Sequence, residues 1–396
     1  MQPDGAPFRP GAGVDVLHKT FTHRRADGWL APLPAELDSP RTLVLAFGAS
    51  EYADHPQPFA ELAAAFPQSV LIGCSTSGEI AAGQVLYASI SVAVAKFTDT
   101  RLRLALAQVA APAESRAAGE RLAAQLPRDG LRAVFVLSDG LSVNGTALVE
   151  GLGGALPAGV EITGGLAGDG SRFESTWVLV GGRPQRGHVS AVGFYGERLR
   201  VTHGCDGGWS DFGPARHITR SEGNILYELD GRPALDLYKA YLGERAAGLP
   251  GTALLFPLAI KRPGADGDAL VRTILGIDEA ARSMTFAGDM PEGAVARLMR
   301  TSTDHLIDSA SHAVRQASAQ FAADAAPLIV AVSCVGRRLV LGERTDEECE
   351  TVVDGAPAGA SHVGFYSSGE ISPALGGNGT SELHNQTMTV TAFCET

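Results

Sequence analysis

The segment LIGCSTSGEI, residues 71–80, ends an apolar run in a small polar turn that carries a glycine and one carboxylate. Nearly the same turn recurs as GFYSSGEI at residues 364–371. Each copy precedes a strand-like alternating run, ISVAVAKF after the first and TMTVTAFC after the second. The shared order of strand, polar turn, carboxylate and strand predicts an internal duplication, in which the two turns are equivalent features of related halves.

The residues of the turn allow two interpretations. Glycine permits a tight backbone turn and the close approach of another group, while serine hydroxyls and backbone N–H groups offer hydrogen bonds. In one interpretation each turn is structural and its glutamate caps a backbone amide. In the other, Ser77, Glu79 and Glu370 contact a ligand.

Short β-rich runs alternate with helical patterns along the chain, as in TLVLAF at residues 42–47 and the helical segment 113–125. This alternation predicts an α/β (α+β) fold of two related layered domains, with mixed, largely antiparallel sheets and packed helices. We expect an N-terminal extension at residues 1–40, a first domain at 41–202 and a second at 203–396.

Composition limits the possible partners. The 396 residues are 45% hydrophobic and carry a formal net charge of −12, with acidic and basic residues interspersed. This charge pattern argues against nucleic acid and anionic membranes as partners. No run approaches the roughly 20 apolar residues that a membrane-spanning helix needs. The five cysteines are far apart and form no C-x-x-C pair, so we expect reduced thiols in a cytoplasmic protein. The abundance of glycine, with 48 residues, and of alanine is typical of a bacterial protein.

Five motifs in order resemble the FIST family of paired N-terminal and C-terminal sensory domains: GCSTSGEI, ITGGLAGDG, YELDGRPALDLY, GFYSSGEI and LHNQTM. The resemblance spans residues 42–395 and implies an intracellular ligand-binding sensor in signal transduction. Since no output module follows the last motif, it implies action on a separate histidine kinase or a cyclic-di-GMP synthase or phosphodiesterase.

Residues 203–231 resemble the stand-alone FIST subgroup that binds haem and senses nitric oxide. Haem b would be held non-covalently here, because no C-x-x-C-H motif occurs. A haem sensor needs a large apolar pocket and an axial ligand, commonly histidine. His203, which follows the strand-like run RLRVT and borders glycines, is the favoured iron ligand, and His188 is the second candidate. A satisfied structural histidine is the alternative for each.

A FIST sensor of a small polar ligand, such as an amino acid, is the alternative function. His384, Asn385 and Gln386 offer several hydrogen-bond donors and acceptors immediately before a strand, which suits such a ligand. A network that ties the last strand to a neighbouring loop would use the same residues. Among the carboxylates, we expect three to meet a ligand amine: Glu79, Glu370 and Asp139, the last at the end of the strand AVFVLSDG.

Catalysis is not expected, and a hydrolase is only a distant alternative. A nucleophile elbow needs G-x-S-x-G, and GCSTSGE does not supply that spacing around Ser75 or Ser77. The sequence also contains no P-loop, no G-x-G-x-x-G after a strand and no H-E-x-x-H. We therefore expect a binding protein and not an enzyme.

Overall fold

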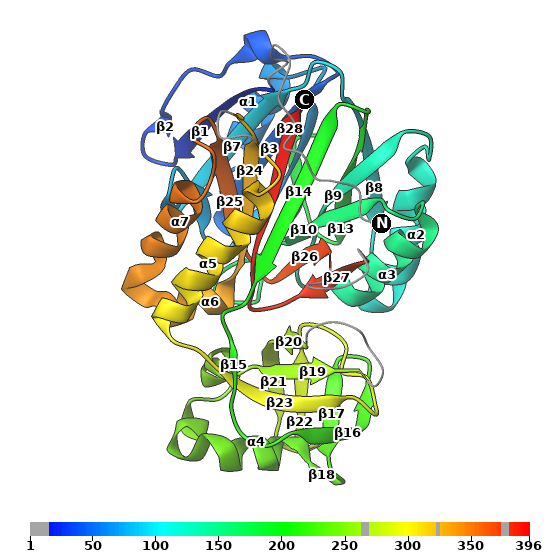
Figure 1. The fold of residues 1–396 in the computed structure, drawn as a ribbon, viewed down its shortest axis with the longest axis vertical. Helices are drawn as coiled ribbons and strands as arrows, with labels where there is room; N and C mark the ends of the chain where they lie inside the picture. The colour runs from blue at the N-terminus through cyan, green and yellow to red at the C-terminus, as the bar shows by residue number, and fades with distance from the viewer. Residues whose placement is uncertain (1–15, 263–268, 322–324, 374–379) are drawn as a thin grey trace, which may run out of the picture.

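The computed structural model describes residues 16–262, 269–321, 325–373 and 380–396. It consists of a large body of three sheets and a smaller β-rich lobe below it (Figure 1). Only three of the described strand pairs are parallel, β3 with β4, β9 with β10 and β24 with β25. The predicted α/β class with mixed, largely antiparallel sheets is therefore confirmed.

Each body sheet contains the same unit: two parallel strands connected through helical structure, then an antiparallel strand beside the first of them and another antiparallel strand at the edge. The first unit has β3 (Thr42–Ala49), α1 (Gln57–Ala65), β4 (Val70–Thr76), β7 (Ser89–Lys96) and β1 (Leu17–Arg24). The second has β9 (Leu131–Ser138), α3 (Gly145–Ala155), β10 (Glu161–Leu166), β13 (His188–Tyr195) and β8 (Arg101–Gln108). The third has β24 (Leu328–Cys334), α6 (Val335–Leu341), α7 (Thr345–Asp354), β25 (Ser361–Ser367), β28 (Met388–Glu395) and β14 (Leu199–Asp206).

The three units are joined in a ring because each passes a hairpin to another sheet. The hairpin of β5 (Glu79–Ala81) and β6 (Gln84–Leu86) leaves the first unit and pairs with β25. The hairpin of β11 (Val178–Val180) and β12 (Arg183–Gln185) leaves the second unit and pairs with β4. The hairpin of β26 (Gly369–Pro373) and β27 (Ser381–His384) leaves the third unit and pairs with β10.

The turns SGEI therefore do lie at equivalent places, and a third turn completes the set. Thr76, Leu166 and Ser367 pair in the same register with the last residues of β3, β9 and β24. The residues that follow them are Ser-Gly-Glu, Ala-Gly-Asp and Ser-Gly-Glu. The predicted duplication is thus part of a threefold repetition, whose middle copy lies in ITGGLAGDG.

One glycine in each unit explains how the parallel strands pack. An added Cβ would lie 2.0 Å from the Ala46 carbonyl oxygen at Gly73, 1.9 Å from that of Val136 at Gly164, and 2.0 Å from that of Ala331 at Gly364. A side chain at any of these positions would overlap the neighbouring backbone. Gly73 and Gly364 occupy equivalent positions, whereas Gly164 lies one residue nearer the end of its strand. Each second parallel strand therefore needs a glycine close to its carboxyl end.

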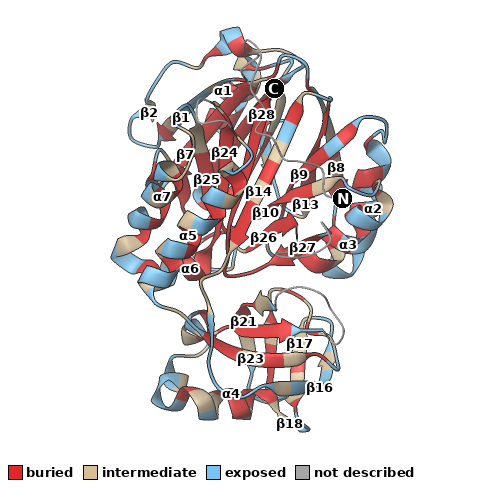
Figure 2. Cartoon of the chain, in the orientation of Figure 1, coloured by how far each residue is buried: buried red, intermediate tan, exposed pale blue. Residues whose placement is uncertain are grey.

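The core of the body is shared by all three sheets, whose strands are largely buried (Figure 2). Phe47 of the first unit stacks on Phe365 of the third at 4.6 Å between ring centroids, and Phe194 of the second stacks on Phe393 of the third at 4.8 Å. Helices pack on the outer faces, including α2 (Ser115–Gln125) and α5 (Thr303–Ser318). The helix expected at 113–125 is thus present as α2.

The lobe is inserted between β14 and α5 and has its own hydrophobic core. Its elements are β15 (Ser210–Asp211), β16 (Arg216–Glu222), β17 (Ile225–Leu229), β18 (Arg232–Pro233), α4 (Ala234–Leu242), β19 (Leu258–Lys261), β20 (Leu270–Arg272), β21 (Ile274–Asp278), β22 (Ser283–Phe286) and β23 (Val295–Arg300). Residue 203, the predicted start of the second domain, lies inside β14, the first strand of the third unit.

Residues 1–15 of the predicted N-terminal extension lie outside the described residues, whereas β1, also within that extension, pairs with β7 along its whole length. A short edge strand, β2 (Gly28–Trp29), follows β1. Within the described ranges no helix is both long and apolar enough to cross a membrane.

Candidate functional site

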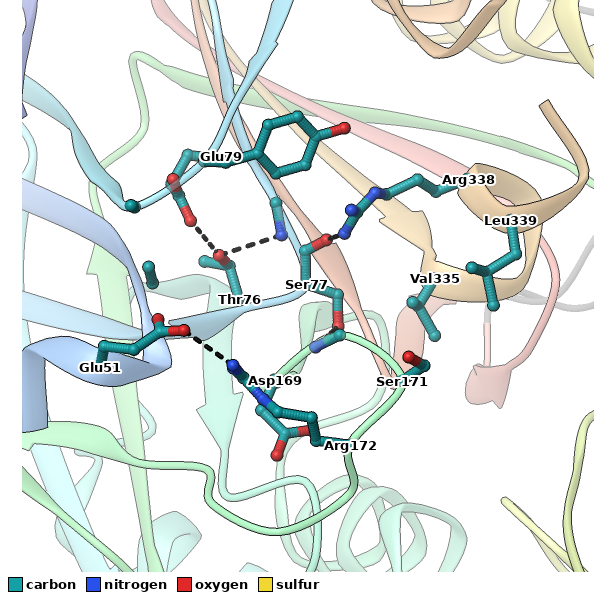
Figure 3. Close-up of a pocket in the computed structure, with 15 residues that line it drawn as sticks. Glu51, Thr76, Ser77, Glu79, Asp169, Ser171, Arg172, Val335, Arg338 and Leu339 are labelled. Atoms are coloured by element: carbon teal, nitrogen blue, oxygen red, sulfur yellow. Dashed lines mark hydrogen bonds and ion pairs between the residues drawn. The ribbon is translucent and has the colours of Figure 1, made fainter. Parts of the chain in front are cut away.

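A pocket of about 270 Å³ lies beside the first SGEI turn, and we call it the SGEI pocket. All three units line it. The first contributes the turn residues Thr76 to Glu79 together with Glu51 and Tyr87, the second the loop 169–172, and the third the helix α6. Figure 3 shows Glu51, Thr76 and Glu79 on one side and Val335, Arg338 and Leu339 on the other.

Backbone hydrogen bonds between units hold the turn in place. The Ser77 N–H donates to the Tyr366 carbonyl at 2.7 Å, and the Tyr366 N–H donates to the Gly78 carbonyl at 2.8 Å. The second unit joins through the Gly170 N–H, which donates to Ser77 Oγ at 2.9 Å. A displacement of this turn therefore affects all three units.

Glu79 is a buried carboxyl group in the wall of the pocket. It accepts hydrogen bonds from the Thr76 hydroxyl at 2.5 Å, the Ser89 hydroxyl at 2.6 Å and the Ser89 N–H at 3.2 Å. Burial raises the pKa of Glu79 to about 7, and these hydrogen bonds to the charged form only partly oppose the rise. Its protonation state therefore changes near neutral pH.

Glu370 has the same environment in the third unit but does not line the SGEI pocket. It accepts from the Ser367 hydroxyl at 2.5 Å, the Thr387 hydroxyl at 2.9 Å and the Thr387 N–H at 3.1 Å. Burial raises the pKa of Glu370 to about 7 as well. Because the two glutamates differ mainly in whether they reach the pocket, Glu370 is a natural control for Glu79.

In the second unit, Asp139 binds the backbone at the start of the antiparallel strand β13, as Glu79 and Glu370 do at β7 and β28. It accepts from the N–H of Gly187 at 2.9 Å, directly before β13, and from the Thr176 hydroxyl at 3.0 Å. The N–H groups of Leu141 and Ser142 donate to Oδ1, the oxygen that also accepts from the Thr176 hydroxyl. All three predicted carboxylates thus fix the start of an antiparallel strand, and of the three only Glu79 also borders the SGEI pocket.

Two arginines that the sequence analysis did not single out bring positive charge to the pocket. Arg172 is paired with Glu51 at 2.7 Å and also donates to the Ser50 hydroxyl. Arg338 donates through Nη1 to the Ser77 carbonyl and lies 4.6 Å from the Tyr87 ring centroid. Within the described ranges Arg338 has no carboxylate at ion-pair distance, and its Nε and Nη2 donate no hydrogen bond.

His203 and His188 lie in different sheets and neither lines the SGEI pocket. His203 is half-buried on β14, with Nδ1 3.3 Å from a Glu161 carboxylate oxygen. The Nδ1 atom of His188 is 2.7 Å from the Arg186 carbonyl. A carboxylate beside a half-buried ring is not the large apolar enclosure that haem requires. The described residues around these histidines therefore do not fit haem. Within the described ranges no cluster of three or more His, Cys, Asp or Glu side chains could hold a metal ion.

His384, Asn385 and Gln386 lie together, but outside the SGEI pocket, where the body meets the lobe. The ring of His384 contacts the Ser372 carbonyl through Nε2 at 3.2 Å. Burial lowers the pKa of His384 to about 4, so the imidazole is neutral at physiological pH. The side chains of all three residues are buried.

The sequence comparisons agree with this threefold chain being a FIST protein. The FIST N domain matches residues 42–232 and the FIST C domain matches residues 234–373, so the chain belongs to the FIST-domain proteins, a sensory and signalling family. No curated protein matches the sequence.

Two solved structures show low similarity over most of the chain. A cyanuric acid hydrolase from A. caulinodans has a TM-score of 0.34 and 11% identity, covering 96% of this chain and 99% of its own. A second cyanuric acid hydrolase structure has a TM-score of 0.32 and 10% identity, covering 96% of this chain and 100% of its own.

Proposed function

We propose that this FIST protein is a sensor that binds a small polar ligand of the amino-acid type in the SGEI pocket. The observation that carries the proposal is the guanidinium of Arg338, which has no carboxylate at ion-pair distance among the described residues and lies in a pocket whose opposite wall carries Glu79 (Figure 3). A cation and a carboxyl group on two sides of one pocket match the two charged ends of an amino acid.

Arg338 is suited to bind the ligand carboxylate. Its Nη1 is fixed by the Ser77 carbonyl and its guanidinium lies against Tyr87, so the side chain is already oriented. Its Nε and Nη2 form the edge that binds a carboxylate through two parallel hydrogen bonds. Glu79, or Asp169 in the second-unit loop, would then accept from the ligand amine.

The same pocket offers a route from binding to signalling. Its walls belong to three units, so a ligand that contacts all of them favours one arrangement of the units if it binds that arrangement more tightly. The changed surface would be detected by a separate histidine kinase or a cyclic-di-GMP synthase or phosphodiesterase, as the family resemblance implies.

Thermal melting of the full chain with each of the twenty common amino acids tests the proposal. We expect at least one of them to raise the melting temperature, because selective binding to the folded state stabilises it. Arg338→Met should weaken this ligand at least tenfold, since one charge-assisted contact pair is lost. Glu370→Gln should leave the affinity unchanged. An equal response of wild type and Arg338→Met, or no response to any amino acid, would contradict the proposal.

Haem-based nitric-oxide sensing stays a prediction of the resemblance alone. The visible spectrum after haem addition and nitric-oxide exposure tests it: a Soret band that moves with nitric oxide supports haem, and a colourless protein contradicts it. Hydrolysis likewise stays a distant alternative.

A further inference from the structure

Several buried polar atoms lack partners where the lobe covers the body. Asn385 is 0% exposed, and among the described residues neither its Oδ1 nor its Nδ2 has a hydrogen-bond partner. Gln386 is also 0% exposed, and its Oε1 is unpartnered. A buried polar group without a partner is unfavourable. Such groups are therefore expected to have a partner in the working protein.

The lobe adds a buried cation to the same interface. Arg272, in β20, is 1% exposed and donates from Nη1 to the carbonyl of Leu383 in the body at 3.0 Å. Its contacts with the carbonyls of Asp289 and Val271 are longer, both at 3.4 Å. In the described part of the chain no carboxylate lies at ion-pair distance from Arg272, and its Nη2 donates no hydrogen bond.

Burial lowers the pKa of Arg272 to about 10, so the guanidinium is still charged at neutral pH. The carboxylates of Glu382 and Asp289 favour the charged form only from beyond ion-pair distance. A buried charge without a direct ion pair is unfavourable. The adjacent Thr273 hydroxyl is buried and unpartnered as well. An anion at this interface would therefore relieve a real electrostatic cost.

Two hydrogen bonds connect the body segment 383–386 to the lobe. Leu383 accepts from Arg272, and Gln386 Nε2 donates at 3.1 Å to the carbonyl of Leu254 in the lobe, within the 3₁₀ helix Gly251–Leu255. Asn385 lies between these two contacts in sequence. The short segment that carries Asn385 is therefore attached to the lobe at both of its ends.

The position that Gln386 occupies in the third unit corresponds, in the first unit, to a residue that lines the SGEI pocket. Ser89 and Thr387 are the equivalent donors to Glu79 and Glu370. The residues directly before them, Ala88 and Gln386, both have positive φ, 52° and 63°. A non-glycine residue held in this region is strained, and such strain concentrates at functional sites. The third unit therefore repeats the wall of the SGEI pocket, but with the lobe over it.

We infer that this interface is a second binding site, for a small carboxylate that also carries an N–H donor. The carboxylate binds the guanidinium of Arg272 and the Nδ2 of Asn385. The N–H donor is bound by Asn385 Oδ1 or Gln386 Oε1. Because the site takes Arg272 from the lobe and the amides from the body, its ligand fastens the lobe to the body. This inference does not depend on the ligand proposed for the SGEI pocket.

Thermal melting of the full chain with three simple probes tests the site, at matched ionic strength against sodium chloride. Malonamate carries both a carboxylate and an amide N–H, acetate only the carboxylate, and acetamide only the amide. We expect malonamate to raise the wild-type melting temperature most, acetate less, and acetamide not at all. Arg272→Met should remove the malonamate shift and Asn385→Leu should reduce it, whereas Arg338→Met should keep it.

A second measurement separates a binding arginine from a structural one. Without probe, Arg272→Met should be at least as stable as wild type, because the substitution removes an uncompensated buried charge. A lower melting temperature of Arg272→Met without probe would overturn the inference, as would a malonamate shift that is equal in both proteins or absent from wild type. Loss of the shift in Arg338→Met but not in Arg272→Met would assign the probe to the SGEI pocket instead.

Discussion

Arg337→Met is expected to lower the free energy of unfolding by about 3–5 kcal/mol, because it leaves a buried carboxylate without its cation. Arg337 and Glu348 are both fully buried and lie 2.6 Å apart between Nη2 and Oε1. Arg337 also donates to the carbonyls of Leu306 at 2.9 Å and Gly207 at 2.7 Å. The pair thus connects α6 and α7 to α5 and to the chain entering the lobe.

The other hydrogen bonds of Glu348 keep its carboxylate buried after Arg337 is replaced. Its Oε2 accepts from the Tyr366 hydroxyl at 2.5 Å and from the Ser333 hydroxyl at 3.0 Å. Burial raises the pKa of Tyr366 well above its ordinary value, and the nearby Cys349 and Glu348 raise it further. The hydroxyl therefore remains a donor. Glu348 therefore keeps its place when Arg337 is removed.

Urea denaturation of the two proteins measures the effect. Arg344→Met is the matched control, since Arg344 is an exposed arginine paired with Asp304 and Glu347. Exposed pairs of this kind contribute little to stability. A loss below about 1 kcal/mol in Arg337→Met would show that the buried pair does not hold the third unit together.

Stability should also fall as the pH rises from about 4.5 to about 7, through Glu79 and Glu370. The pKa of each is raised from an ordinary value of 4.5 to about 7 by burial. The folded protein therefore binds more protons than the unfolded chain within this window, and the free energy of unfolding decreases with pH there. The contribution is on the order of 3 kcal/mol for each carboxyl group.

Chemical denaturation at pH 5 and pH 8 checks this prediction. Glu79→Gln and Glu370→Gln keep a neutral side chain of similar shape, so each should remove part of the stability difference between the two pH values. The double variant should remove both parts. If the difference in wild type and double variant were the same, these carboxyl groups would not be the source of the pH dependence.

The sequence reveals only those copies of the repeated unit whose turns have similar residues. Two copies read SGEI, but the middle copy has Ala167 and Asp169 where the others have serine and glutamate. The exchange of hairpins between sheets leaves no local signal, because strand pairing across units depends on the packing of the whole body. The lobe is likewise a set of short strands, and no local pattern marks it as an insertion. It is recognised as one only because the chain comes back to the body at α5.

The site was predictable to a similar extent. Ser77 and Glu79 stand out because they belong to the repeated turn, and they do line the pocket. Tyr87 lies in the same unit, after the hairpin that follows the turn. Arg338 comes from α6 of the third unit, and only the closure of the ring brings it to the turn. Asn385 and Gln386 stand out as hydrogen-bonding residues, but their burial results from the lobe, which no spacing in their own motif indicates.

The central claim is that the SGEI pocket binds the ligand, and isothermal titration calorimetry tests it most directly. The titrant is the amino acid that stabilises the full chain most, and the proteins are wild type, Glu79→Gln and Glu370→Gln. We expect a binding event in the SGEI pocket, separate from any binding at the Arg272 interface, that Glu79→Gln weakens and Glu370→Gln leaves unchanged. Equal affinity in all three proteins would contradict it, because the two glutamates share burial and hydrogen bonding and differ in access to the pocket.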